Sequence, residues 1–166
     1  MKSLKYTSFV LLTTLVISCT NPPDYPIIPH IEYIGASKNV LRRGAFNEDT
    51  TFVTFSFTDG NGDIGRSDAS GELDLFLEDK RTGVSVDNFR IPLIPKLGAK
   101  NGIRGEITFQ LFTTCCNFPE DLGLDPCFDS TPEFPQDTVI YKIFIVDRAG
   151  NKSNVIETDP FFILCQ

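Results

Sequence analysis

The sequence predicts an all-β domain in which about seven antiparallel strands form a two-sheet sandwich. Apolar and polar residues alternate along several segments, turn residues separate these segments, and the 166 residues include 15 phenylalanines and no tryptophan. Alternation is typical of a strand that buries one face, and aromatic side chains favour pleated sheets. A chain of this length has room for one domain with a single modest core.

The period of two is clearest at 53–57, 73–77 and 107–111, where every second residue is Val, Leu, Ile or Phe. The segment 139–146 is apolar on both faces, and Pro160 predicts an edge strand or a bulge within 154–164. The full set of predicted strands is 31–36, 53–57, 73–77, 89–94, 107–111, 139–146 and 154–164. Their number and the turns between them are typical of an immunoglobulin-like sandwich, with a small open barrel as the alternative.

The N-terminus has the features of an export signal that ends in a lipid attachment site. Lys2 and Lys5 accompany an apolar stretch, 6–17, which is too short to span a bilayer. The sequence Val-Ile-Ser-Cys that ends at Cys19 resembles the lipobox of bacterial lipoproteins. The resemblance implies that 1–18 is a signal peptide and that Cys19 becomes the first residue, carrying covalent lipid that anchors the protein to a membrane.

Residues 19–30 are predicted to form a proline-rich tether between the lipid and the domain. Pro22, Pro23, Pro26 and Pro29 disfavour a helix and a central strand, so an extended spacer is expected. His30, the single histidine, ends this tether and is expected to be solvated, because no second histidine exists to share a ligand. The sandwich domain then covers 31–166.

Two further segments resemble known modules. The stretch 141–154 is similar to the last hairpin of bacterial immunoglobulin-like and fibronectin-like domains, in which an aromatic-led strand runs into an Asp-x-Ala-Gly-Asn turn. The lipobox, the tether and the sequence FTDGNGDIG at 57–65 together resemble outer-membrane lipoproteins of Bacteroidota. The resemblance implies a lipid-anchored outer-membrane protein, on either the periplasmic or the cell-surface face.

The segment 59–65 is the one motif with the chemistry of a cation site. Asp59, Asn61 and Asp63 place oxygen ligands at alternate positions among glycines, as a calcium ion requires. The loop is not an EF-hand, because its sixth position is Ile64 and its twelfth is Ser70. A complete calcium site therefore needs ligands from elsewhere in the chain.

Strand direction suggests where those ligands are. If seven strands alternate in direction, the turns after the second and sixth strands lie at one end of the sandwich, so Asp147 and Asn151 should approach the 59–65 loop. The tether should begin at this end. Asp-Gly and Asn-Gly pairs also suit a tight polar turn without any metal, so both interpretations stay open.

Four cysteines besides Cys19 predict two disulfides in an oxidising compartment. Neighbours on a strand point to opposite faces, which disfavours a bond between Cys115 and Cys116. Either Cys116 pairs with Cys127 and Cys115 with Cys165, which is preferred, or the partners are exchanged. A zinc site is the alternative, although a Cys-x-x-Cys pair is missing.

The segment 113–137 is unusually long for a loop, and it is either functional or merely tolerated. Its apolar residues stand among prolines and acids and either expose a patch for a partner or cap the open end of the core. These residues are Phe118, Leu122, Leu124, Phe128 and Phe134.

The composition excludes some functions. Acidic residues outnumber basic ones by 22 to 15, so nucleic acid is not an expected partner. His30 lies on the tether, and the Glu78 and Asp79 pair ends a strand with no pocket implied, so no enzyme is predicted. The expected function is a lipid-anchored binding or accessory module that docks on an outer-membrane protein assembly. The alternative is a calcium-stabilised surface module that binds glycan or a host ligand.

Overall fold

The computed structural model describes residues 24–95 and 102–166, so Cys19 and the first residues of the predicted tether, 19–23, lie outside the described residues. The described part has two short 3-10 helices, η1 (Asp68–Ser70) and η2 (Glu120–Leu122). Among these residues, no helix has the length and apolar character needed to cross a bilayer. The strands are β1 (His30–Ala36), β2 (Val40–Arg42), β3 (Thr50–Asp59), β4 (Leu75–Asp79), β5 (Val84–Phe89), β6 (Ile103–Phe112), β7 (Gln136–Val139), β8 (Tyr141–Ile145), β9 (Ile156–Glu157) and β10 (Phe161–Leu164).

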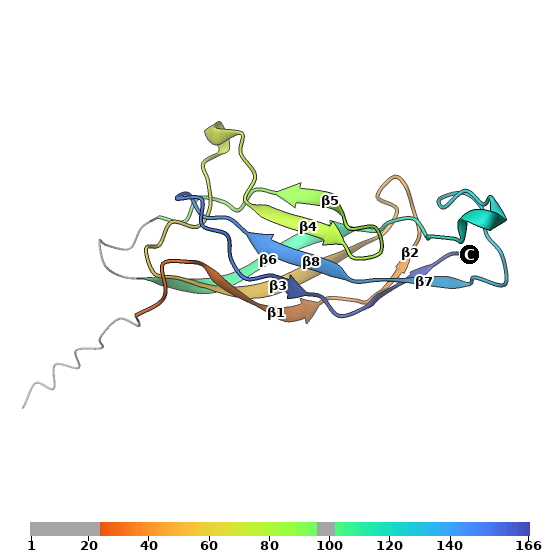
Figure 1. Ribbon diagram of the computed structural model, residues 1–166, viewed down its shortest axis with the longest axis horizontal. Helices are drawn as coiled ribbons and strands as arrows, with labels where there is room; N and C mark the ends of the chain where they lie inside the picture. Colours follow the sequence, from red (N-terminus) through yellow and green to blue (C-terminus); the bar gives the residue numbers. More distant parts are fainter. Residues whose placement is uncertain (1–23, 96–101) are drawn as a thin grey trace, which may run out of the picture.

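The strands form three sheets, which confirms the all-β prediction and fits a small sandwich (Figure 1). The sheets have the orders β1-β3-β6, β5-β4-β8-β9 and β2-β10-β7. Pairing is antiparallel throughout except between β10 and β2, which run parallel. The Phe89 ring of β5 lies 5.1 Å from the Phe109 ring of β6, so the first two sheets pack face to face.

The core follows from the alternation in the sequence. Val53, Phe55 and Phe57 of β3 are buried at every second position, and β3 pairs with β6 over its whole length. On the opposite sheet, Leu75 and Leu77 of β4 are buried and face the same interior. Burying each such side chain stabilises the fold by about 1.5–3 kcal/mol, so this alternation dominates the stability.

Two chain segments change sheets partway along. β7 pairs with β10 and β8 pairs with β4, and the two strands are separated only by Ile140. Likewise β9 pairs with β8 and β10 pairs with β2 and β7, with Pro160 just before β10. Pro160 has no backbone N–H, which explains the interruption that the sequence predicts there.

The structure has ten strands instead of about seven, and some boundaries differ. β1 begins at His30, which was assigned to the tether, and β2 was not predicted. β5 covers Val84–Phe89 instead of 89–94, because Ile91 is buried as part of a loop and its N–H donates to Asp74 Oδ1 (2.6 Å). β4 begins only at Leu75, since the buried side chain at position 74 is the aspartate.

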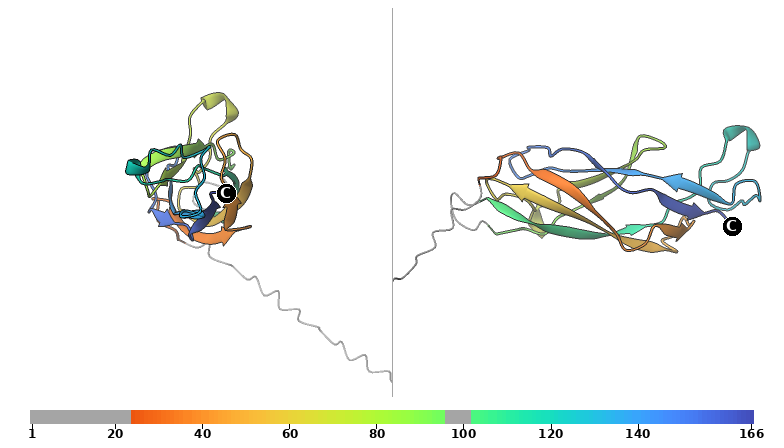
Figure 2. Two further views of the ribbon diagram at one scale, coloured as in Figure 1. Left: turned by 90° about the vertical axis from the view of Figure 1, so that its right-hand side faces the viewer. Right: turned by 90° about the horizontal axis from the view of Figure 1, so that it is seen from below.

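The molecule has two distinct ends (Figures 1 and 2). At one end the chain enters: the Gly60 N–H, just after β3, donates to Pro26 O (2.8 Å). The loop 146–152 lies at this end too, and we call it the tether end. The C-terminus and the loop 113–135 lie at the opposite end, which we call the distal end. This arrangement agrees with the strand-direction prediction.

Candidate functional site

Three carboxylates meet at the tether end, as the sequence predicts. Asp59 ends β3, Asp63 follows in the next turn, and Asp147 comes two residues after β8. One oxygen from each lies within 4.8 Å of the others. Asp59 and Asp147 have no exposed surface and Asp63 is 5 % exposed. We call these three residues the carboxylate cluster.

The 59–65 loop is held in shape by the Asp59 carboxylate, by a glycine turn and by the Arg148 guanidinium. The Asp63 N–H donates to Asp59 Oδ2 (2.8 Å), and Gly62 adopts a φ of 66° that favours glycine. The Arg148 guanidinium donates to Ile64 O (3.1 Å) and Gly65 O (2.7 Å). The positive charge of Arg148 is therefore used to bind carbonyl groups of this loop.

Asn151, a predicted metal ligand, positions Asp147. Its backbone N–H donates to Asp147 Oδ1 (2.7 Å) and its side-chain Nδ2 donates to Asp147 Oδ2 (2.8 Å). Each carboxylate oxygen has a second lone pair, so Asp147 retains acceptor capacity. The turn 147–151 thereby aims a fixed carboxylate at the 59–65 loop.

The carboxylate cluster and the adjoining 59–65 loop have unsatisfied acceptors. Asp59 Oδ1 and Asn61 Oδ1 are buried and accept no hydrogen bond within the described residues. Burial raises the pKa of Asp59 above its usual range, and the negative charges of Asp63 and Asp147 raise it further. The arrangement has the chemistry to hold a hard cation or a proton.

The distal end contains both disulfides. Cys115 is bonded to Cys127, and Cys116 is bonded to Cys165. The prediction of two disulfides is confirmed, but the preferred pairing was wrong and the exchanged one is present. Cys116 points into the core, where the last residues of the chain arrive, whereas Cys115 faces the loop that contains Cys127.

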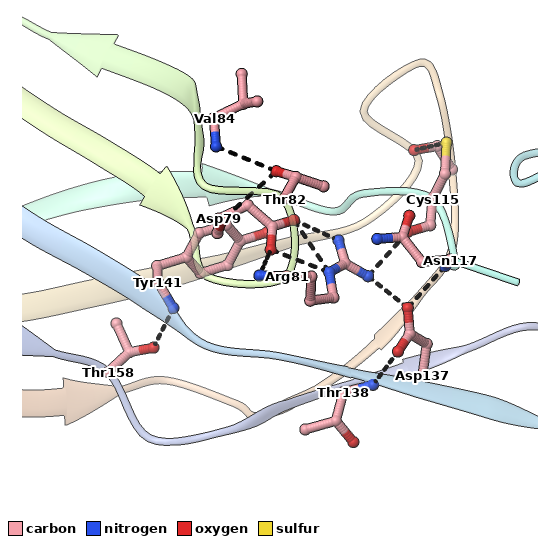
Figure 3. Close-up of polar contacts among 11 residues, drawn as sticks. Asp79, Arg81, Thr82, Val84, Cys115, Asn117, Asp137, Thr138, Tyr141 and Thr158 are labelled. Carbon is pink, nitrogen blue, oxygen red and sulfur yellow. Dashed lines mark hydrogen bonds and ion pairs between the residues drawn. The ribbon is translucent and has the colours of Figure 1, made fainter. Parts of the chain in front are cut away.

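A partly buried arginine stabilises this end, and it was not predicted from the sequence (Figure 3). The Arg81 guanidinium, with 13 % of its side chain exposed, forms ion pairs with Asp79 and Asp137. Arg81 Nη1 also donates to Cys115 O (3.3 Å), and Asp137 Oδ2 accepts from Asn117 N (2.7 Å). Arg81 thus connects the β4–β5 turn to the first residues of the 113–135 loop.

The predicted apolar residues of the loop divide into two groups. Phe118 packs against the core and its ring lies 6.2 Å from that of Phe134, so these two cap the sandwich, and Leu124 is half-buried. Leu122 is 41 % exposed and Phe128 is 69 % exposed. Both predicted roles therefore occur, on different residues.

The neighbouring loop between β2 and β3 adds an exposed aromatic residue that was not predicted. Phe46 is 76 % exposed, and its loop contacts the 113–135 segment through Gly44 N to Thr114 O (3.3 Å) and Arg43 Nη2 to Phe128 O (3.3 Å). The signal in the sequence was a phenylalanine in a polar turn. We call Phe46, Leu122 and Phe128 the distal tip.

The tip lies among negative charge. The segment 113–135 contains no Lys, Arg or His, and its five acidic residues are all exposed: Glu120, Asp121, Asp125, Asp129 and Glu133. Exposed aromatic residues with a polar rim are typical of protein-binding surfaces.

His30, the single histidine, begins β1 at the tether end of the molecule, and its Nε2 lies 3.6 Å from Glu32 Oε1.

Comparison of the chain with protein-family models, with curated proteins and with solved structures finds no match.

Proposed function

We propose that the protein is a non-catalytic module, lipid-anchored in the bacterial outer membrane through Cys19, that docks on a membrane-protein assembly through its distal tip. The observation that supports this most strongly is the placement of the tip. Phe46 and Phe128 are the two most exposed large apolar side chains of the described residues. The loops that contain them, between β2 and β3 and between β6 and β7, lie at the end opposite the tether (Figure 1).

The restraints on the loop at the distal end support a preorganised binding surface. Residues 113–135 form little regular structure, yet the Cys115–Cys127 bond and the brace from Arg81 constrain their beginning and middle. A restrained loop loses less conformational entropy on binding than a free one.

The charge of the loop identifies the chemistry of the partner. Five exposed carboxylates around Leu122 and Phe128 match a protein surface that has a basic rim and an apolar pocket. The lipid anchor would raise the local concentration of the tip beside other membrane proteins, so a modest intrinsic affinity suffices. Binding should weaken as salt increases, because exposed charges are screened.

The test is affinity purification from membranes extracted in a gentle detergent, with a tag inserted after Gly71, an exposed turn remote from the tip. We expect the parent protein to retain a stoichiometric membrane protein and Phe128→Ala to lose most of it, because truncating a central aromatic anchor costs about 2 kcal/mol or more, roughly 30-fold in affinity. Leu93→Ala is the matched control, since Leu93 is 50 % exposed outside the tip.

Retention of the same partner by Phe128→Ala would contradict the proposal. Recovery of the parent protein alone, with glycan bound to it, would instead support the second candidate, a calcium-stabilised surface module that binds glycan or a host ligand. The carboxylate cluster supports the calcium stabilisation in this second candidate and has no bearing on its ligand. The two functions predict different co-purifying molecules, so one experiment separates them.

A further inference from the structure

We propose that Asp59, Asp63 and Asp147 bind a calcium ion at the tether end, with Asn61 Oδ1 as a further ligand. This metal site is separate from the docking surface, and either proposal can fail without the other. The carboxylates come from two loops that are more than 80 residues apart in the sequence, and strand pairing brings them together.

The first argument is charge. Burying three carboxylates within 4.8 Å of one another is costly unless a cation or protons compensate. Neither Asp59 nor Asp147 forms an ion pair among residues 24–95 and 102–166. The nearby guanidinium groups have other partners: Arg66 forms an ion pair with Glu72 and donates from Nη2 to the Asp147 carbonyl (2.9 Å). Arg148 donates to carbonyls of the 59–65 loop.

The second, independent argument is the orphaned oxygens. Asp59 is fully buried and its Oδ1 accepts no hydrogen bond, and the buried Asn61 Oδ1 accepts none either. A buried acceptor without a donor is destabilising, and such atoms are rare in folded proteins. A cation held by the carboxylate cluster would satisfy Asp59 Oδ1, and Asn61, two residues from both Asp59 and Asp63, would bring its Oδ1 to the same ion.

The ligand chemistry selects calcium. Carboxylate and amide oxygens suit a hard cation, whereas zinc prefers the nitrogen and sulfur ligands that this cluster lacks. Oxygens on opposite sides of a calcium ion lie about 4.6–5.2 Å apart, because each Ca–O distance is 2.3–2.6 Å. Atoms already within 4.8 Å of one another can therefore contact one calcium ion with little movement. Magnesium demands near-ideal octahedral geometry and gives up its water reluctantly, so a site built from protein oxygens suits it less well.

The site lies directly under the incoming chain. Gly60 N donates to Pro26 O (2.8 Å), and a Cβ at Gly60 would stand only 2.2 Å from Tyr25 O. Residues 25–26 thus pack on the loop that would hold the ion. Calcium binding would then fix the direction in which the sandwich leaves its tether.

The test uses the full-length protein in detergent and compares its thermal midpoint in calcium chloride, magnesium chloride and chelator. A 100-fold excess of calcium over its dissociation constant should raise the midpoint by roughly 8 °C for a domain of this size. Magnesium at the same concentration should give a smaller shift. Hydrogen exchange should slow at the Gly60 and Asp63 amides, which hold the loop in place.

Asp59→Asn should affect the thermal midpoint differently in chelator and in calcium. In chelator, its midpoint should equal or exceed that of the parent, because one of three repelling charges is removed. In calcium, its shift should be lost. Asp74→Asn is the matched control, since Asp74 is also fully buried and its Oδ2 also lacks a partner, but it lies outside the cluster. This variant should keep the calcium shift.

A parent midpoint that calcium leaves unchanged would overturn the proposal, and so would a calcium shift in Asp59→Asn as large as that of the parent. Should Asp59→Asn fail to fold, calorimetric titration of the parent with calcium and with magnesium decides. Heat of binding that saturates at one calcium per chain supports the site. Absence of such heat refutes it.

Discussion

Arg81 shows how much one residue can hold together. Its guanidinium is bracketed by the carboxylates of Asp79 and Asp137, and it also reaches the Cys115 carbonyl at the beginning of the distal loop (Figure 3). Removing either carboxylate would leave part of the guanidinium charge uncompensated, and removing the guanidinium would leave both carboxylates uncompensated. The side chain therefore supports the distal tip without belonging to it.

Replacing Arg81 by methionine should destabilise the protein by about 3–5 kcal/mol, because two carboxylates are left without their cation. The control is Arg90→Met, which removes an ion pair to Asp68, a residue with 94 % of its side chain exposed, and should cost less than about 1 kcal/mol. Urea denaturation of both variants measures the difference. Equal losses would show that the Arg81 network contributes no more than a surface pair.

The sequence predicted the positions of some functional residues and not of others. The carboxylate cluster could be predicted because strand direction alone decides which turns meet, and Asp59, Asp63 and Asp147 do meet. Phe46 and Arg81 could not be predicted in the same way. Their roles depend on which loops lie side by side at the distal end, and this proximity leaves no periodic pattern in the sequence.

At the scale of elements, the disulfides have different tasks. Cys116–Cys165 joins the segment that follows β6 to the residue just after β10 inside the core, and both cysteines are fully buried. Cys115–Cys127 closes a loop of 12 residues at the surface. The first therefore secures the fold, and the second restrains the distal loop.

The double variant Cys116→Ala with Cys165→Ala should lose about 4 kcal/mol or more, since its bond spans 49 residues and its removal leaves a cavity. Removing Cys115 and Cys127 in the same way should cost about 3 kcal/mol and should also weaken retention of the membrane partner. Denaturation and affinity purification of each variant give both readouts. A larger stability loss from the surface pair would contradict this division.

Long strands with strict alternation were predictable and short or edge strands were not. β3 and β6 have the clearest periods, and they lie where the sequence predicts. β2 has only three residues and pairs in parallel with a strand 122 residues further along the chain, so no local pattern marks it. On β5, Val84 is 60 % exposed, whereas Ile91 in the next loop is buried, which reverses the pattern that a strand would show.

The whole molecule is organised from one end to the other. The tether and the carboxylate cluster lie at one end, and the disulfide-bonded 113–135 loop and the C-terminus lie at the other (Figures 1 and 2). This separation was predictable, because it needs only alternating strands and the positions of turns. The disulfide pairing at the distal end was not predictable, because it depends on how the irregular segment after β6 lies relative to the C-terminus.

Photo-crosslinking in intact cells tests the two-ended account directly. A benzophenone side chain would replace Phe128 at the distal tip or Ile27 at the tether end, two residues that are 69 % and 62 % exposed. We predict that position 128 forms an adduct of one defined mass with a membrane protein and that position 27 does not capture that protein. Capture of a protein from position 27, with none from position 128, would contradict the account.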